Sequence, residues 1–185
     1  MKLLLENWRE YLDESKLRVF DFDDTLAVSD SKVVVVYPDS TSEELTPEEF
    51  ADHEYKPYEN EYDFSQFDEV INPVQIKSVV KRLRGAVEAE GEREIVILTA
   101  RSQKAAPAIR IWLKSIGIDT SKIKIVGLED PNPQKKANWI EDRIKSGADD
   151  VLFLDDSQQN VDIVALLGDK YPEILMVSDR INVRK

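Results

Sequence analysis

After residue 72, short apolar stretches alternate with longer stretches of helical periodicity, and this alternation restricts the fold more than any other feature of the chain. We predict a helix first and then strands and helices in turn over residues 72–89, 95–99, 104–116, 122–126, 133–146, 151–154, 159–167 and 174–177. Strands that alternate with helices of ten or more residues are joined by right-handed crossovers into a parallel sheet. The fold class is therefore predicted to be α/β, a three-layer α/β/α Rossmann-like fold.

A further strand is predicted at residues 17–20, and it ends directly in a run of carboxylates, Asp21-Phe22-Asp23-Asp24-Thr25. Side chains two residues apart on a strand point to the same face, so we expect Asp21 and Asp23 to converge. Like charges at short distance repel each other, and a bound cation or a shared proton relieves the repulsion. The sequence therefore predicts a magnesium-dependent site at the end of this strand.

Three more polar motifs follow along the chain. The strand at 95–99 ends in Thr99-Ala100-Arg101, the pair Lys135-Lys136 opens a helix, and the strand at 151–154 is followed by Asp155-Asp156. Ligands of open parallel sheets bind at the carboxyl ends of the strands. We therefore expect the four motifs to meet at one edge of the sheet.

In this order, the four motifs resemble those of the haloacid dehalogenase-like superfamily of phosphotransferases: Asp-x-Asp-x-Thr, a strand-end Thr or Ser, a Lys, and an acidic pair. The resemblance spans residues 19–162. It implies that Asp21 attacks phosphorus and becomes an aspartyl phosphate. It also implies that Asp23 protonates the leaving oxygen and later takes a proton from water, which favours a phosphatase, a hydrolase of phosphomonoesters.

The resemblance implies Mg²⁺ as the cofactor, held by Asp21, by the backbone carbonyl of Asp23 and by the acidic pair. Within that pair Asp156 is favoured as the direct ligand and Asp155 as the residue that orients the lysine, although the order remains open. Magnesium prefers oxygen ligands and keeps several waters, so this set is sufficient.

Positive charge and hydrogen-bond donors are needed around the transferring phosphoryl group, and the resemblance assigns these roles to Thr99 and Lys136. Lys136 is favoured over Lys135 because the apolar residues three and four positions later match the family's spacing, but both stay open. Thr25 and Arg101 are candidate substrate-binding residues. A surface ion pair is an equal alternative for Arg101.

Residues 29–72 differ in character from the rest of the chain. A β-branched strand is predicted at 32–37, Thr46 is predicted to cap a short helix, and 54–68 is acidic and aromatic. In the superfamily, an insertion at this place is a cap that covers the site and selects the substrate. We therefore divide the chain into a core, residues 1–28 and 73–185, and a small cap, residues 29–72.

The aromatic residues of the insertion are expected to be partly packed and partly turned toward the site; they are Tyr55, Tyr58, Tyr62, Phe64 and Phe67. His53, the single histidine, is expected at the surface rather than as a ligand. A helix is predicted over residues 2–14, either packed on the edge of the core or docked to a second copy of the chain.

The net charge of −12 disfavours nucleic acids as partners, because nucleic-acid binding depends on basic residues that neutralise phosphates. We therefore expect a small phosphorylated metabolite or nucleotide as substrate. No membrane partner is expected. The absence of cysteine fits a reducing cytoplasm, and no apolar stretch is long enough to be a membrane span or a signal peptide.

Two alternatives to a small-molecule phosphatase remain. A nucleic-acid 3′ or 5′ end phosphatase needs a basic groove, which the net charge disfavours. A non-hydrolytic phosphoacceptor signalling domain also combines acids, Thr and Lys on a parallel sheet. In that family, however, the acidic pair follows the first strand and the phosphorylated Asp comes later, whereas here the acidic pair is last.

Overall fold

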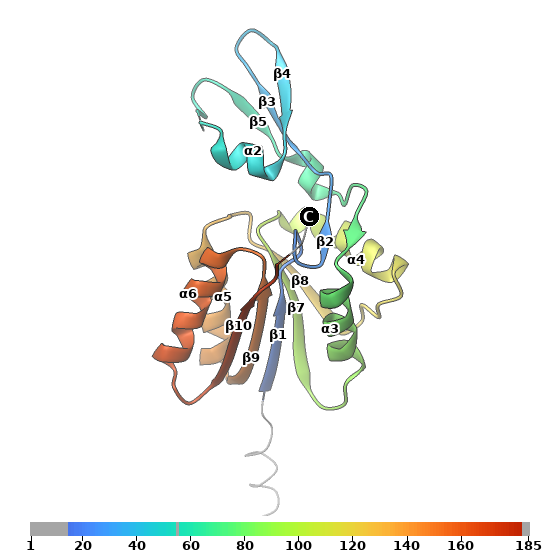
Figure 1. The fold of residues 1–185 in the computed structure, drawn as a ribbon, viewed down its shortest axis with the longest axis vertical. Coiled ribbons are helices and arrows are strands. Elements are labelled where there is room, and N and C mark those ends of the chain that lie inside the picture. Colours follow the sequence, from blue (N-terminus) through green and yellow to red (C-terminus); the bar gives the residue numbers. More distant parts are fainter. Residues whose placement is uncertain (1–14, 55, 183–185) are drawn as a thin grey trace, which may run out of the picture.

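A five-stranded parallel sheet forms the centre of the computed structural model, which describes residues 15–54 and 56–182 (Figure 1). The strand order is β10-β9-β1-β7-β8. The strands are β1 (Ser15–Phe20), β7 (Arg93–Thr99), β8 (Ile123–Gly127), β9 (Ala148–Asp155) and β10 (Leu175–Arg180). The predicted α/β class with a parallel, Rossmann-like sheet is confirmed.

Helices cover both faces of this sheet, with α3 and α4 on one side and α5 and α6 on the other (Figure 1). Alternation along the central strands supplies two apolar cores: Ile95 and Ile97 of β7 pack on the first side, and Val96 and Leu98 pack on the second. The helices are α3 (Lys77–Glu88), α4 (Ala106–Ser115), α5 (Pro133–Lys145) and α6 (Gln158–Lys170). Burial on both faces explains why the strands read as continuous apolar runs.

Two helix starts differ from the prediction. The helix predicted at residues 72–89 begins only at Lys77, because β6 (Val74–Gln75) pairs with β2 (Ala27–Val28) and Asn72 has a positive φ of 44°. A residue before proline is disfavoured in helical conformation, which is consistent with this late start. The helix predicted at 104–116 is divided into a 3₁₀ turn, η2 (Gln103–Ala105), and α4.

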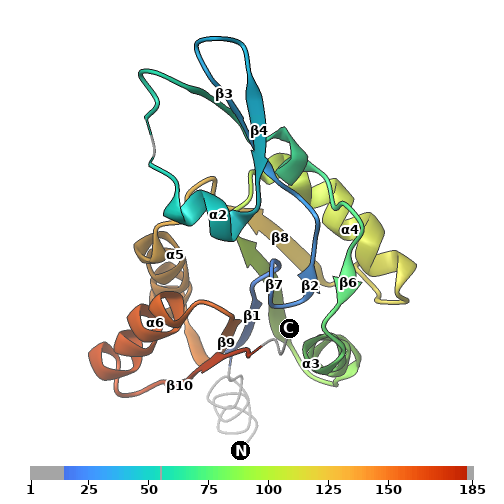
Figure 2. The same cartoon turned by 45° about the horizontal axis from the view of Figure 1, so that its top comes forward.

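The insertion, residues 29–72, forms a second and smaller sheet beyond the carboxyl ends of the central strands (Figures 1 and 2). It is antiparallel, with the order β4-β3-β5. Its elements are β3 (Val33–Val36), β4 (Ser42–Leu45), α2 (Pro47–Asp52), β5 (Glu61–Asp63) and the 3₁₀ turn η1 (Ser65–Asp68). The strand predicted at 32–37 is β3, and the predicted cap at Thr46 forms a capping box with Glu49.

Aromatic rings give the insertion an apolar centre of its own. The ring of Phe50 lies 5.8 Å from that of Tyr62 and 5.5 Å from that of Phe64, and His53 packs against Tyr62. Tyr58 is fully exposed, and Tyr55 lies outside the described residues. Tyr62 and Phe64 therefore hold the insertion together.

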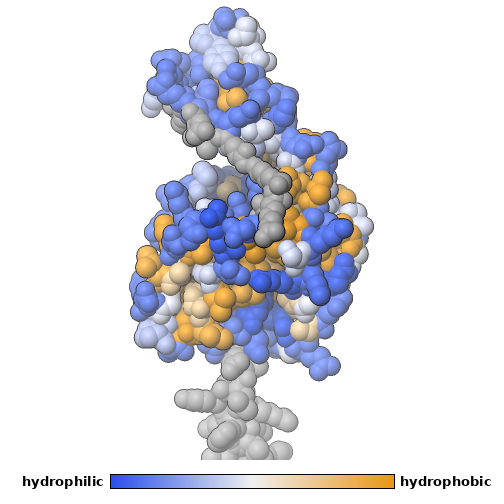
Figure 3. Space-filling model, in the orientation of Figure 1, coloured by the Kyte–Doolittle hydropathy of each residue, from blue (hydrophilic) through white to orange (hydrophobic). Residues whose placement is uncertain are grey.

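On the face shown in Figure 3, the insertion is mainly hydrophilic, whereas the core below it shows apolar residues among hydrophilic ones. Within residues 15–54 and 56–182, no helix has the length and apolar character that crossing a membrane requires. The helix predicted at residues 2–14 lies outside the described residues, so its two alternatives stay predictions.

Candidate active site

Three carboxylates meet where β1 and β9 end side by side. Parallel pairing places Phe20 opposite Leu154, and the amide of Asp21 donates to the carbonyl oxygen of Leu154 at 2.9 Å. The next residues of the two strands, Asp21 and Asp155, are therefore neighbours, and Asp156 follows. Each of the three aspartates offers one carboxylate oxygen, and these oxygens lie within 4.8 Å of one another.

Lys136 connects two of these carboxylates. Its Nζ donates to Asp21 Oδ1 and to Asp155 Oδ2, each at 2.7 Å, and its side chain is only 5% exposed. Burial by itself lowers the pKa of Lys136, but the facing carboxylates offset this and raise the pKa above its usual value. Lys135 is exposed and lies 3.8 Å from Asp130. The helix register thus brings Lys136, and not Lys135, to the acidic group.

Asp155 is saturated with hydrogen-bond donors. Besides Lys136, it accepts from the amide of Ser157 at 2.9 Å and from Asn160 Nδ2 at 2.9 and 3.0 Å. Ser157 caps α6, and Asn160 lies in the first turn of that helix. Asn160 is not part of the predicted motifs; its position three residues after a helix-capping serine is the signal that the sequence offers. These donors fix the carboxylate of Asp155, which in turn fixes the position of Lys136.

Asp156 has the opposite environment. It is half-buried, and its carboxylate forms no ion pair or hydrogen bond with another residue in the described part of the chain. Burial raises the pKa of Asp156 to about 6, and the charges of Asp155 and Asp24 act in the same direction. A partly desolvated, unpaired carboxylate beside two others is a position that a cation would stabilise.

Asp21 is buried, and burial raises its pKa well above the usual value. Lys136 acts against this shift, while the nearby carboxylates of Asp155 and Asp23 add to it. Thr25 Oγ1 lies 3.5 Å from Asp21 Oδ2 and is also buried. One oxygen of Asp21 is thus held by the lysine, and the other has a single weak donor.

Asp23 does not join the three-carboxylate group, and the expectation that Asp21 and Asp23 share one face of a strand is wrong. The strand β1 ends at Phe20, and the chain then turns, with a positive φ of 50° at Asp24. The carboxylate of Asp23 pairs instead with Arg101, at 2.8 Å from Nε and 2.7 Å from Nη2. The role of its backbone carbonyl as a metal ligand stays a prediction.

Thr99 ends β7 at the same edge of the sheet and is buried. Its Oγ1 accepts from the amide of Arg101 at 3.2 Å, and its carbonyl accepts from the amide of Leu128 at 2.9 Å. The loops after β7 and β8 touch so closely that a Cβ on Gly127 would lie 2.5 Å from the carbonyl carbon of Ser102. Glycine at 127 therefore helps to set the position of Thr99 and Arg101.

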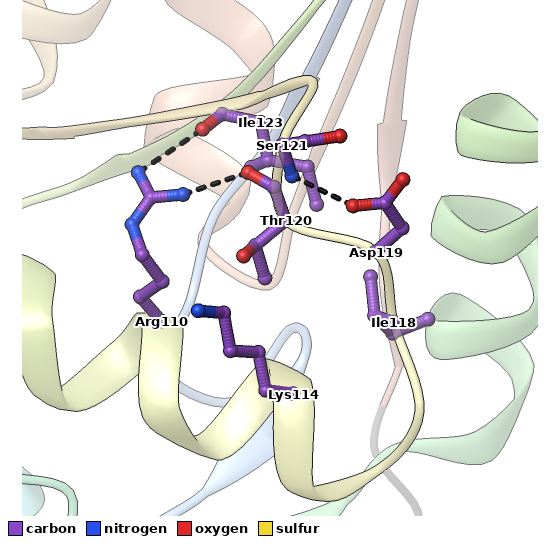
Figure 4. Close-up of a pocket in the computed structure, with 7 residues that line it drawn as sticks. All are labelled: Arg110, Lys114, Ile118, Asp119, Thr120, Ser121 and Ile123. Atoms are coloured by element: carbon purple, nitrogen blue, oxygen red, sulfur yellow. Dashed lines mark hydrogen bonds between the residues drawn. The ribbon is translucent and has the colours of Figure 1, made fainter.

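A cavity of about 420 Å³ lies at the amino end of β8, at the sheet edge opposite to the acidic group (Figure 4). Arg110 points into it but donates to the carbonyls of Thr120, at 2.7 Å, and Ile123, at 3.2 Å. These bonds fasten the loop before β8 to α4. We assign this cavity a structural role.

Comparisons with protein-family models, curated proteins and solved structures found no match to the chain.

Proposed function

We propose that the protein is a magnesium-dependent phosphomonoester hydrolase of the haloacid dehalogenase-like type, with Asp21 as the nucleophile. One observation carries the proposal: a buried aspartate at the carboxyl end of a parallel strand is held by a buried lysine, and an unpaired carboxylate lies beside it. Ligands of such sheets bind at this edge. Structural ion pairs alone do not account for the unpaired Asp156.

The donor set fits a hard divalent cation. Asp21, Asp155 and Asp156 offer oxygen atoms only, and Mg²⁺ prefers oxygen ligands and retains waters beside one or two carboxylates. Asp155 is occupied by donors, so Asp21 and Asp156 are the residues that would hold the ion. When bound, Mg²⁺ supplies positive charge for the oxygens of the transferring phosphoryl group.

The proposed reaction has two steps. In the first, the carboxylate of Asp21 attacks phosphorus, the ester oxygen leaves with a proton from Asp23, and an aspartyl phosphate forms. In the second, water gives a proton to Asp23 and attacks the same phosphorus, so that inorganic phosphate leaves and Asp21 is regenerated. Lys136 and Thr99 stabilise the charge on the phosphoryl oxygens. Asp155 and Asn160 keep the lysine in place.

A small phosphomonoester is the substrate class that the charge favours. The net charge of −12 repels long polyanions, and the insertion above the site is rich in acidic residues. We propose that the insertion acts as the cap that selects among small substrates.

The test is a hydrolysis screen with Mg²⁺ over p-nitrophenyl phosphate, nucleotides, sugar phosphates and 3′- or 5′-phosphorylated oligonucleotides. We expect turnover of small esters, no turnover with EDTA, and a loss on the order of 10³-fold or more in Asp21→Asn. Asp119→Asn, at the opposite edge of the sheet, is the matched control and should keep full activity.

Three outcomes would contradict the proposal. Full activity of Asp21→Asn excludes covalent catalysis at Asp21. Preferred hydrolysis of phosphorylated oligonucleotides identifies a nucleic-acid end phosphatase instead. Stable phosphorylation of Asp21 without turnover identifies a phosphoacceptor domain.

A further inference from the structure

Arg101 uses every N–H donor of its guanidinium group within the protein. Nε donates to Asp23 Oδ2 at 2.8 Å, and Nη2 donates to Asp23 Oδ1 at 2.7 Å and to Ser29 Oγ at 2.9 Å. Nη1 donates to the carbonyl oxygens of Phe67, at 2.9 Å, and Glu69. Arginine has five such donors, and the residue is only 4% exposed. No donor remains for a substrate, contrary to the expectation that Arg101 binds one.

The partners of Arg101 belong to three separate parts of the chain. Asp23 lies in the turn after β1, Ser29 lies where the chain enters the insertion, and Phe67 and Glu69 lie where it returns to the core. The guanidinium carbon also lies 5.2 Å from the ring centres of both Phe22 and Phe67, one from the core and one from the insertion. One buried cation therefore joins both chain crossings to the carboxylate of Asp23.

We propose that Arg101 is a positioning residue that couples the contact of the insertion with the core, here called the seating of the insertion, to the orientation of the Asp23 carboxylate. A two-point contact from arginine fixes the plane of a carboxylate, which a lysine cannot do. Movement of residues 67–69 away from the core breaks bonds to the same guanidinium that holds Asp23. The acid–base part of this proposal rests on the proposed phosphatase function, whereas the seating part does not.

The kinetic test compares Arg101→Lys with wild type on p-nitrophenyl phosphate and on an alkyl phosphate. Only the alkyl ester needs strong protonation of its leaving oxygen, so kcat for that ester should fall by roughly 10- to 100-fold and its KM should stay unchanged. The p-nitrophenyl ester should be affected much less. Arg110→Met, which removes an arginine bound to two carbonyls at the opposite sheet edge, is the matched control.

Two kinetic results would overturn the proposal. A raised KM with equal losses for both esters means that Arg101 contacts the substrate directly. Additive losses in the double variant with Asp23→Asn mean that the two residues act independently, because a residue that acts through Asp23 has no further effect once that carboxylate is gone.

The seating part is tested by hydrogen exchange, which needs no activity. In Arg101→Lys, amides in peptides that cover residues 29–31 and 67–69 should exchange faster, and those of α5 should not change. Unchanged exchange at 29–31 and 67–69 overturns the coupling. If wild type hydrolyses no phosphomonoester but exchange rises as expected, the proposed function fails and the seating role stands.

A milder variant keeps the proposal testable if Arg101→Lys does not fold. Ser29→Ala removes one acceptor of Nη2 and a weak donor to Asp23 Oδ1, at 3.3 Å, and it leaves the two bonds between Arg101 and Asp23 in place. We expect a change in the same direction, in exchange and in alkyl ester turnover, but smaller than in Arg101→Lys. A larger effect of Ser29→Ala on turnover counts against Arg101 as the centre of the coupling.

Discussion

Asp156 should destabilise the metal-free protein at neutral pH, and Asp156→Asn should remove that effect. The pKa of this carboxyl rises from 3.8 to about 6 on folding, mainly because of burial. The folded state therefore holds this proton more tightly than the unfolded state. Between about pH 4 and pH 6 the free energy of unfolding falls as pH rises, and the deficit is complete above the folded-state pKa.

The shift sets the size of the effect. About 2 pKa units correspond to about 3 kcal/mol at most, since one unit is about 1.4 kcal/mol. Because Asp156 is only half-buried, solvent screening reduces this figure to about 1–2 kcal/mol. Asp156→Asn should therefore raise the free energy of unfolding by that amount near pH 7 and change it little near pH 4.

Urea denaturation in EDTA, repeated across this pH range, measures the effect. The quantity to follow is the difference between wild type and Asp156→Asn, because Asp21 has a raised pKa and contributes with the same sign. Asp149→Asn replaces an exposed carboxylate on the same strand and is the control. Mg²⁺ should stabilise wild type near pH 7 and have less effect on Asp156→Asn. A loss of stability in Asp156→Asn near pH 7 would refute the reasoning, because it would reveal a stabilising partner of the carboxylate.

Three further changes test separate parts of the site. Lys136→Met should abolish turnover and lower the free energy of unfolding by about 3–5 kcal/mol, because it leaves two carboxylates without their cation. Its control, Lys135→Met, should change the free energy of unfolding by less than about 0.5 kcal/mol. A larger effect of Lys135→Met than of Lys136→Met would assign the site to Lys135. Gly127→Ala should lower kcat and destabilise the protein by about 1–3 kcal/mol, because the new Cβ meets the backbone of Ser102. Its control, Gly85→Ala, lies in an open helical position and should stabilise the protein slightly. A Gly127→Ala variant with full activity and stability would show that the loops after β7 and β8 can separate at no cost. Replacement of residues 40–66 by a Gly-Ser linker should spare p-nitrophenyl phosphate hydrolysis and reduce discrimination among natural esters; unchanged substrate preference in a folded variant would place specificity in the core.

The layered core could be predicted because its strands are buried on both faces and read as continuous apolar runs. The residues at which helices begin were harder to predict than the strands. Pro73 favours the first turn of a helix, but residues 74–75 pair with residues 27–28, a contact between segments far apart in sequence. Local signals at Asn72 and Pro73 cannot reveal such a pairing.

In the site, too, contacts that follow from the sheet topology could be predicted, whereas other contacts between segments far apart in sequence could not. Asp21, Lys136 and Asp155 could be predicted to meet, because the carboxyl ends of adjacent parallel strands share one edge of the sheet. The pairing of Asp23 could not be predicted, because β1 ends at Phe20 and the alternation of side chains along a strand does not apply beyond it. The partners of Arg101 include two backbone carbonyls of the insertion, and carbonyls carry no sequence signal.

Charge balance supports the proposal that the site binds a cation in addition to its own residues. Three carboxylates gather there, from Asp21, Asp155 and Asp156, and the carboxylate of Asp23 lies nearby in its pair with Arg101. The buried cations near these four carboxylates are Lys136 and Arg101. Arg101 is committed to Asp23, and Lys136 is shared between Asp21 and Asp155, so the uncompensated charge is concentrated at Asp156 and Asp21. A phosphate dianion would be repelled at this place. A divalent cation held by these two carboxylates would cancel that excess negative charge, so in the proposed hydrolase the metal would favour substrate binding as well as catalysis.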